Sequence, residues 1–402
     1  MTDIPRKVGV VGLGVMGFDI AFLYAMKGFQ TVVYDASKAV MNSLSDRREQ
    51  TIDRLKKRNR ISDAETENVR NLLRPSPGLG GLAQMDLVTE AVLENSRTKL
   101  AVYRALGDAG FSGIITSNTS SVTRATLLAG GDYDRRKFAL THFFNPVLYT
   151  QMVEVVKGDI AAAQGDAVIS FLKEIGRQPV ETHDISGFVS NGILMAYAVM
   201  ALRLLERGAR IDAVDQAAKE LKLLPPLISF DSWKPSIVED VTRVMFEVRG
   251  DAFLRSSKLL VRLAKDNPTF YVDRLPNPKI YELAEARGRT LDNESIKRAL
   301  LTSMIIAAAR VAELGESPAT VDFVATEGIK MPQPPLKGID EIGPAAVLDD
   351  LEKTNLQLGD QPMPVPALLT RMAEEKQPFY KNDQTNPWLL AHAGRIQTHA
   401  SH

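Results

Sequence analysis

The stretch that decides the fold is Lys7-Val-Gly-Val-Val-Gly12-Leu-Gly14-Val-Met-Gly17, close to the amino terminus. It begins as a short apolar run typical of a buried strand and continues as a Gly-x-Gly-x-x-Gly turn that opens a helical pattern. Gly12 permits the tight turn, Gly14 lets the backbone approach a diphosphate, and Gly17 permits close packing of the helix on the strand. Asp35 ends the next β-rich run, where a carboxylate can accept hydrogen bonds from a ribose.

The order of strand, glycine turn, helix, strand and acid predicts a domain that binds a dinucleotide. The backbone N–H groups at the helix amino terminus would face the diphosphate. We therefore expect the cofactor to contact Gly12, Leu13, Gly14, Val15, Met16 and Gly17. Asp35 would repel a 2′-phosphate, which favours NAD over NADP. The basic pair Arg47 and Arg48 is expected to lie too far along its helix to reverse that preference.

Short β-rich runs alternate with helical patterns up to about residue 183, which predicts βαβ units and a parallel sheet. A charged segment at 38–74 has apolar residues at helical spacing and predicts a helical hairpin that projects from the sheet. Strands are expected at residues 7–12, 31–35, 87–92, 113–117, 138–144, 152–157 and 180–183.

The pattern after residue 184 is almost wholly helical, and it repeats with an offset of 107 residues. The repeat aligns Arg203 with Arg310, Glu206 with Glu313, Gly208 with Gly315, Val214 with Val321, Asp215 with Asp322 and Ala218 with Ala325. We infer two copies of one helical unit. The predicted fold is a Rossmann-type α/β domain with a helical hairpin insertion at 1–183, followed by two related all-α domains at 184–291 and 292–402.

Composition excludes several classes of protein. The 49 basic and 49 acidic side chains give a formal net charge of zero, which argues against nucleic-acid binding. The chain has no cysteine, and its five histidines show no metal-ligand spacing, so we expect no metal. The first apolar run is too short for a signal peptide, and the longest, 189–205, is interrupted by polar residues and predicts a buried helix rather than a membrane span. We expect a cytoplasmic protein.

Three further motifs narrow the function. They are Ser117-Asn-Thr-Ser-Ser-Val122, then Thr141-His-Phe-Phe-Asn-Pro-Val147, then Met152-Val-Glu154. With these motifs the chain resembles the 3-hydroxyacyl-CoA dehydrogenase family, whose hallmarks are an SNTSS turn, an HFFNP motif and a glutamate twelve residues beyond the histidine. Glu90-Ala-Val-Leu-Glu94 and Gly187-Phe-Val-Ser-Asn191 extend the resemblance over nearly the whole chain in collinear order.

Oxidation of a secondary alcohol requires a base that takes the hydroxyl proton as hydride leaves carbon. Histidine suits this task because its unperturbed pKa of ~6.5 keeps a neutral fraction near pH 7. His142 ends an expected strand, at the edge where open α/β sheets bind ligands. Glu154 follows on the neighbouring strand, where it can orient the imidazole and stabilise its charged form. We therefore assign His142 as the catalytic base and Glu154 as its partner.

The resemblance implies further site residues. It places Ser120, Asn145 and Asn191 around the substrate's hydroxyl and thioester carbonyl. It also places Ala91, Glu94, Lys99, Asn118 and Asn145 at the cofactor, with Glu94 and Lys99 at its nicotinamide half. An ion pair on a helix surface is the ordinary alternative for Glu94 and Lys99. The basic run 54–60 is either a solvated face or the contact for coenzyme A phosphates.

The chain departs from the family pattern at three places. Gly192 stands where the family has an arginine after the asparagine of GFxxNR. The segment 224–233 lacks a glycine-rich turn and carries Trp233, which predicts a reshaped wall near the acyl group. Arg298 occupies the second-copy position of Asn191, so only the first copy should contribute to catalysis. The two-copy plan resembles the dehydrogenase part of multifunctional fatty-acid oxidation enzymes, and we expect their hydratase domain to be absent.

The leading prediction is an NAD-dependent enzyme of fatty-acid β-oxidation type that interconverts (S)-3-hydroxyacyl-CoA and 3-oxoacyl-CoA. An alternative is a free β-hydroxyacid dehydrogenase, which shares the wording of the glycine turn but needs a catalytic lysine that the 187–191 segment lacks. A third possibility is a non-catalytic NAD-binding interaction or regulatory protein. The expected partner is an acyl-CoA substrate, without nucleic acid or membrane, and the chain is expected to be a monomer or homodimer.

Overall fold

The structure is a computed structural model that describes residues 4–131, 133–285, 291–359 and 362–393. Its residues form two compact units, 1–184 and 185–402. His399, His402 and most of the stretch 287–292 lie outside the described residues. The expected boundary between two helical domains at 291/292 therefore stays a prediction.

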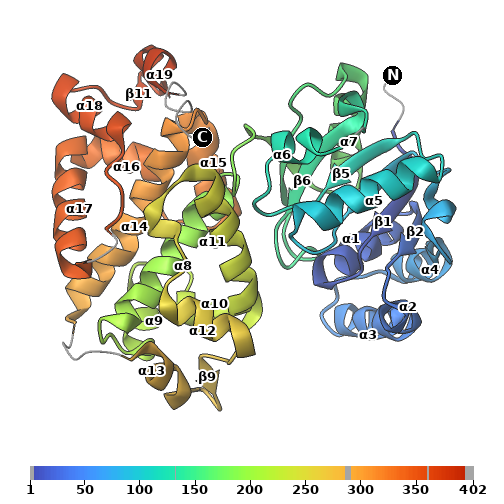
Figure 1. Ribbon diagram of the computed structural model, residues 1–402, viewed down its shortest axis with the longest axis horizontal. Helices are drawn as coiled ribbons and strands as arrows, with labels where there is room; N and C mark the ends of the chain where they lie inside the picture. The colour runs from blue at the N-terminus through green and yellow to red at the C-terminus, as the bar shows by residue number, and fades with distance from the viewer. Residues whose placement is uncertain (1–3, 132, 286–290, 360–361, 394–402) are drawn as a thin grey trace. The chain divides into compact units, whose positions relative to one another are not determined.

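The first unit is built on a sheet that has eight strands within the described residues, in the order β3-β2-β1-β4-β5-β6-β7-β8 (Figure 1). Neighbouring strands are parallel except β6 and β7, which are antiparallel. The predicted Rossmann-type domain is confirmed. The strands are β1 (Lys7–Val11), β2 (Gln30–Tyr34), β3 (Leu73–Pro75), β4 (Leu87–Glu90), β5 (Ile114–Ser117), β6 (Phe138–Phe143), β7 (Met152–Val156) and β8 (Gln178–Glu181).

Two strands differ from the expectation. β3 was not expected, because three residues directly after a helix carry too little pattern to be recognised. β8 begins two residues earlier than expected, since its residues are exposed or half-buried and show no apolar run.

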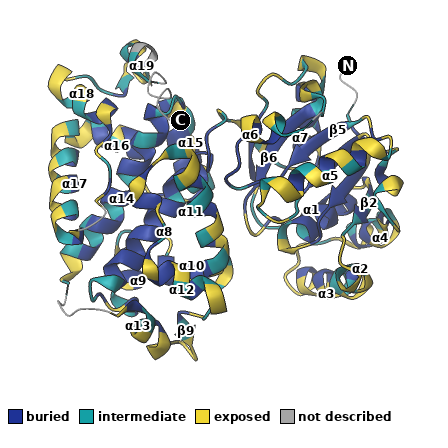
Figure 2. Ribbon diagram, viewed as in Figure 1, coloured by how far each residue is buried: buried dark blue, intermediate teal, exposed yellow. Residues whose placement is uncertain are grey.

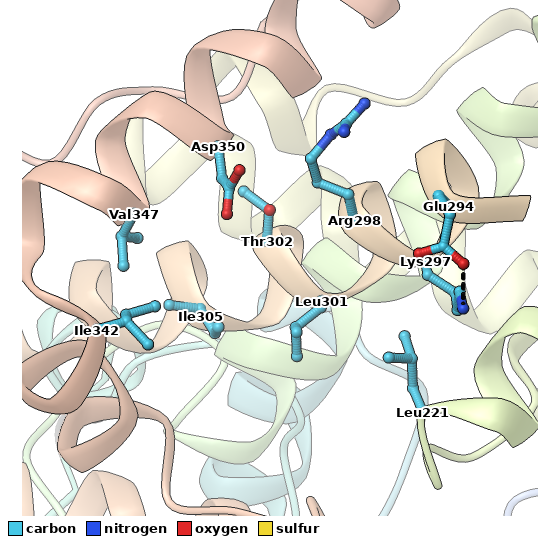
Figure 3. A pocket seen from close by; sticks show the side chains of 10 residues that line it. All are labelled: Leu221, Glu294, Lys297, Arg298, Leu301, Thr302, Ile305, Ile342, Val347 and Asp350. Carbon is cyan, nitrogen blue, oxygen red and sulfur yellow. Dashed lines mark ion pairs between the residues drawn. The ribbon is translucent and has the colours of Figure 1, made fainter.

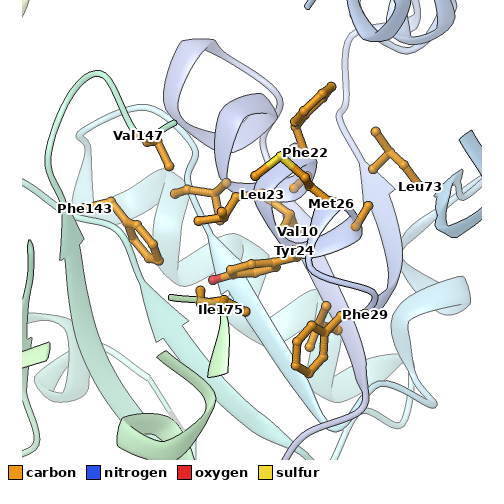
Figure 4. Packing of buried hydrophobic residues seen from close by; sticks show 14 of the residues in the cluster. Val10, Phe22, Leu23, Tyr24, Met26, Phe29, Leu73, Phe143, Val147 and Ile175 are labelled. Carbon is orange, nitrogen blue, oxygen red and sulfur yellow. The ribbon is translucent and has the colours of Figure 1, made fainter. Parts of the chain in front are cut away.

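The core of this unit holds the sheet and helix α1 (Val15–Met26) together (Figure 4). The Tyr24 ring packs edge-on against Phe171, with ring centroids 4.9 Å apart, and against Phe143, at 6.4 Å. Its hydroxyl lies 2.9 Å from the Thr89 hydroxyl in β4. Burial raises the pKa of Tyr24 above its usual range, so the phenol stays neutral and hydrogen-bonded. One side chain thereby ties α1 to β4, to β6 and to helix α7 (Ala162–Glu174).

The expected helical insertion is present as α2 (Lys38–Asn42), α3 (Leu44–Lys56) and α4 (Asp63–Leu72). A capping box starts α4. The Glu65 N–H donates to the Ser62 hydroxyl at 3.2 Å, and the Ser62 N–H donates to the Glu65 carboxylate at 3.0 Å. The remaining helices of this unit are α5 (Ser96–Asp108) and α6 (Arg124–Ala129).

The second unit is helical and contains two series of helices in the same order, as the repeat predicts (Figure 1). The first series is α8 (Ser190–Glu206), α9 (Ile211–Glu220), α10 (Pro226–Trp233), α11 (Pro235–Arg249), α12 (Lys258–Asp266) and α13 (Pro278–Ala284). The second series is α14 (Asn293–Glu313), α15 (Pro318–Phe323), α16 (Pro335–Ile342), α17 (Pro344–Leu358), α18 (Ala367–Glu375) and α19 (Pro387–His392). A pair of two-residue strands, unexpected from the sequence, precedes α13 and recurs before α19.

Buried aspartates make the same connections in both series. Asp215 accepts hydrogen bonds from the N–H groups of Leu227 and Ile228 at the start of α10 and from the Tyr271 hydroxyl. Asp322 accepts the matching set from Leu336, Lys337 and Tyr380. In each copy the carboxylate thus supplies the cap that a helix starting with proline cannot supply itself.

Helices α8 and α14 pack side by side at the centre of this unit. Nearly every residue of α8 is buried, so the predicted burial of its apolar face is confirmed and extends around the helix (Figure 2). Gly192 permits the close approach, because a Cβ there would lie 2.8 Å from Cγ2 of Val311 in α14. Among the described residues, no helix is both long and apolar enough to cross a membrane.

Candidate active site

The glycine turn has the geometry that a bound diphosphate requires. Gly12 has φ of +88°, and a Cβ there would lie 2.7 Å from the carbonyl of Ala91. A Cβ on Gly17 would collide with the Gly12 carbonyl, whereas a Cβ on Gly14 would meet no atom within 4 Å. The space in front of Gly14 is therefore open. No side chain caps α1 and no acidic residue lies in its first turn, so its N–H groups suit an anion.

Asp35 follows β2 and binds the turn directly. Its Oδ2 accepts a hydrogen bond from the Leu13 N–H at 2.7 Å, and its Oδ1 accepts one from the Ser37 N–H at 2.8 Å. The carboxylate is held beside the turn with lone pairs left for a ribose hydroxyl. Predicted contacts Val15 and Met16 open α1, where Val15 is exposed and Met16 half-buried.

The expectation that Arg47 lies too far from the cofactor turn is wrong. Its Nη1 donates to the Leu13 carbonyl at 2.7 Å and its Nη2 to the Gly14 carbonyl at 3.1 Å. Its guanidinium carbon lies 4.1 Å from the centroid of the Phe18 ring. The projecting helix α3 folds back and carries Arg47 onto the turn, which sequence distance alone does not reveal. Arg48 instead pairs with Glu49.

We expect Arg47→Met to weaken NADH binding roughly tenfold, because the turn loses two charge-assisted hydrogen bonds and a nearby positive charge. Fluorescence titration with NADH measures the effect. Arg48→Met is the matched control and should leave the dissociation constant unchanged. Equal affinities for the two variants would show that Arg47 does not support the cofactor site.

A buried network of charges supports the Ser117–Val122 turn. The Lys99 ammonium lies 2.9 Å from Oε1 of Glu90 and 3.3 Å from Oε2 of Glu94, and the Lys99 side chain is fully buried. Glu94 also accepts hydrogen bonds from the N–H groups of Ser120 and Ser121 at 2.6 and 2.7 Å. An ion pair on a helix surface, the alternative for Glu94 and Lys99, is therefore wrong. Their contact with the nicotinamide half stays a prediction.

The network also changes how these groups ionise. Burial alone would raise the pKa of Glu94, but Lys99 and the hydrogen bonds of the turn together lower it. Burial alone would lower the pKa of Lys99, but the two carboxylates raise it. Glu90 was not predicted as a site residue, although it begins the quoted Glu90–Glu94 motif. Its carboxylate accepts from Lys99, from the Tyr103 and Ser117 hydroxyls and from the Val92 N–H.

The turn is joined to β6 by Asn118, whose Oδ1 accepts a hydrogen bond from the Phe143 N–H at 3.0 Å. Phe143 follows His142 directly. This one contact therefore holds the start of the turn beside the strand that carries the predicted base. Ser120, two residues further on, is half-buried.

His142 and Glu154 form the predicted pair. They lie directly opposite each other in the antiparallel ladder of β6 and β7. Nδ1 of His142 lies 2.9 Å from Oε2 of Glu154, whose side chain is fully buried. Because a carboxylate can only accept, Nδ1 carries the proton in this contact and Nε2 is the acceptor nitrogen of the ring. The arrangement is that of an oriented general base.

The remaining predicted residues fall into separate places. Ala91 follows β4 and lies under the glycine turn, and Asn145 lies exposed after β6. Asn191 is half-buried in the first turn of α8, in the helical unit. In the basic run, Arg58 donates to the Tyr149 hydroxyl at 3.1 Å and Arg60 stacks over the same ring. The run is exposed, and contact with coenzyme A phosphates stays a prediction.

The helical unit has a groove of about 330 Å³ along α14, α16 and α17 (Figure 3). Polar Asp350, Thr302 and Arg298 lie on one side of it, and aliphatic Ile342, Ile305 and Leu301 lie on the other. None of the predicted catalytic residues lines this groove. Arg298 lines it at the position that the repeat assigns to Asn191, which agrees with a second copy that lacks this part of the chemistry.

Comparison with known families and proteins gives consistent results. The family model described as 3-hydroxyacyl-CoA dehydrogenase, NAD binding domain, matches residues 7–185. The model described as 3-hydroxyacyl-CoA dehydrogenase, C-terminal domain, matches twice, at residues 187–269 and 296–385. The two C-terminal matches correspond to the two series of helices.

Individual relatives agree with the family models. A probable 3-hydroxybutyryl-CoA dehydrogenase of Deinococcus radiodurans is 31% identical over 264 residues, which cover 64% of this chain and 94% of the relative. The fatty acid oxidation complex subunit alpha of Pseudomonas putida is 27% identical over 93% of this chain and 56% of its own length. The crystal structure of 3-hydroxybutyryl-CoA dehydrogenase from Escherichia coli K12 has a TM-score of 0.76 and 21% identity, covering 92% of this chain and 98% of that one, and shows the same fold.

Proposed function

The chain belongs to the 3-hydroxyacyl-CoA dehydrogenase family, and from this premise we propose that it oxidises an (S)-3-hydroxyacyl-CoA to the 3-oxoacyl-CoA with His142 as base and Glu154 as its partner. The family is NAD-dependent, and this chain is an oxidoreductase of that kind. NAD, when bound, supplies the acceptor for the hydride. The observation that carries the proposal is the 2.9 Å contact between His142 Nδ1 and Glu154 Oε2.

The residues of the first unit fit the cofactor. The open space at Gly14 and the uncapped amino terminus of α1 suit a diphosphate, and Asp35 suits a ribose that carries no 2′-phosphate. A carboxylate beside a 2′-phosphate would be repelled, so NADH should be used in preference to NADPH. Arg47 does not offset this repulsion fully, because its Nη1 and Nη2 are committed to the carbonyls of Leu13 and Gly14.

In the proposed step, His142 Nε2 takes the hydroxyl proton and Glu154 stabilises the imidazolium that results. In the reverse direction the imidazolium returns the proton to the carbonyl oxygen. Ser120, Asn145 and Asn191 are proposed to contact the hydroxyl and the thioester carbonyl. As neutral donors they can stabilise developing negative charge without titrating. The substrate class follows the relatives' names, which include 3-hydroxybutyryl-CoA.

The test is to mix the protein with NADH and acetoacetyl-CoA and to follow the nicotinamide absorbance. We expect NADH to be consumed, and NADPH to be consumed much more slowly. Acetoacetate without CoA is the control and should not react. Turnover of the free acid alone would favour a β-hydroxyacid dehydrogenase, and NADH binding without turnover of any substrate would favour a regulatory protein.

A further inference from the structure

Arg249, the last residue of α11, is buried without a matching partner. Its Nε and Nη1 are shielded from solvent and have no hydrogen-bond acceptor. No ion pair joins Arg249 to a carboxylate in the part of the chain that the structure describes. A buried guanidinium in this state is costly, because both its charge and its N–H groups have lost water without replacement.

A second arginine faces the same place. Arg310 of α14 pairs through Nη1 with Glu313, while its Nε is also buried without an acceptor. Arg249 and Arg310 both line an enclosed cavity of about 10 Å³, with Gly192, Ala196 and Asp251 among its other walls. This volume is the size of a single water or a monatomic ion.

The nearest carboxylates are already committed. Glu313 pairs with Arg310 and accepts a hydrogen bond from the Leu368 N–H. Asp251 accepts one from the Phe253 N–H. Burial lowers the pKa of Arg249 to about 10, and Arg310 lowers it further by repulsion, although Asp251 and Glu313 act in the opposite direction. The cavity thus lies in a region of uncompensated positive charge.

The cavity belongs to the first copy alone. Gly192 leaves room for the arginine, since a Cβ there would lie 3.7 Å from Nη1 of Arg249. Leu358 is the last residue of α17 and so takes the place of Arg249 in the second copy. The duplication therefore does not explain the charge, which points to a role specific to this place.

We propose that the cavity between Arg249 and Arg310 is a binding site for one monatomic anion, chloride. Nε and Nη1 of Arg249 and Nε of Arg310 are donors, and an anion accepts from all three while it neutralises charge. A water would need acceptors for its own two protons, and a polyatomic anion exceeds the cavity volume. The site goes beyond the proposed function and lies against Gly192, the neighbour of Asn191.

The test follows thermal unfolding of the whole chain while chloride replaces gluconate at constant ionic strength. Trp233 and Trp388 are the two tryptophans and both lie in the helical unit, so their fluorescence reports on the unit that contains the site. We expect the unfolding temperature to rise by about 3 °C as chloride saturates the site. Arg249→Met should abolish this dependence. Arg243→Met, a half-exposed arginine of the same helix, should retain it.

Diffraction from crystals grown in bromide gives a second measurement that does not depend on stability. An anomalous peak between Arg249 and Arg310 is expected in the parent protein and should be absent in Arg249→Met. An unfolding temperature that ignores chloride, or a cavity that holds water without an anomalous peak, would overturn the proposal. Neither measurement uses turnover, so failure here is distinct from failure of the proposed activity.

Discussion

His142→Gln should lower turnover by roughly 10²–10⁴, the usual contribution of a general acid–base group, while NADH binding stays unchanged. The glycine turn, Asp35 and Arg47 form the cofactor contacts and do not involve His142. The glutamine retains a polar side chain opposite Glu154 but cannot accept the hydroxyl proton. Steady-state kinetics with acetoacetyl-CoA and fluorescence titration with NADH measure the two quantities separately.

Two further observations distinguish a catalytic loss from a structural one. Glu154→Gln should act through the same unit, so the double variant should lose much less than the product of the single losses. In the oxidation direction, the parent rate should rise with pH through one ionisation, because only neutral imidazole accepts a proton. That ionisation should vanish in His142→Gln. Near-normal turnover with an unchanged pH profile would require another base and withdrawal of the assignment.

Lys99→Met should lower the free energy of unfolding by about 3–5 kcal/mol, because it leaves Glu90 and Glu94 buried without their cation. Urea unfolding followed by circular dichroism measures the loss. Lys57→Met removes an exposed lysine and should have almost no effect. If Lys99→Met does not fold, the Lys99→Met, Glu94→Gln double variant should recover part of the stability, since one carboxylate becomes neutral.

The loss should depend on pH with a defined sign. The pKa of Glu94 is lowered in the folded protein, so this ionised group contributes stability above about pH 4.5, and the contribution is lost as pH falls through the folded pKa. In Lys99→Met the carboxylates can take up protons instead. The difference between the parent and the variant should therefore be largest near neutral pH and shrink toward pH 4. A difference that grows as pH falls would contradict the assigned charges.

The elements that alternate strongly in hydrophobicity could be predicted from the sequence. β1, β4 and β5 are apolar on consecutive positions because both faces are buried, and α8 is apolar throughout because it lies at the centre of the helical unit. β3 and the two-residue strands before α13 and α19 could not be predicted, since their hydrogen bonds depend on partners distant in the pattern.

The site shows the same division. His142 and Glu154 were predictable because motif and strand order place them on neighbouring strands. Arg47 was misjudged because the fold of the hairpin, not its distance along the chain, brings it to the glycine turn. Lys99 resembles a surface lysine in sequence, and only the burial of Glu90 beneath it makes it part of the interior. Arg249 gives no signal in sequence at all.

The ladder between β6 and β7 has a consequence for how selectivity can change over evolution. Hydrogen bonds of the ladder set His142 opposite Glu154, so the connecting segment 144–151 does not determine their separation. Substitutions or small length changes in that segment can reshape the surroundings of Asn145 while the base and its partner keep their register. The reaction and the choice of acyl group are therefore encoded in different parts of the chain and can diverge independently.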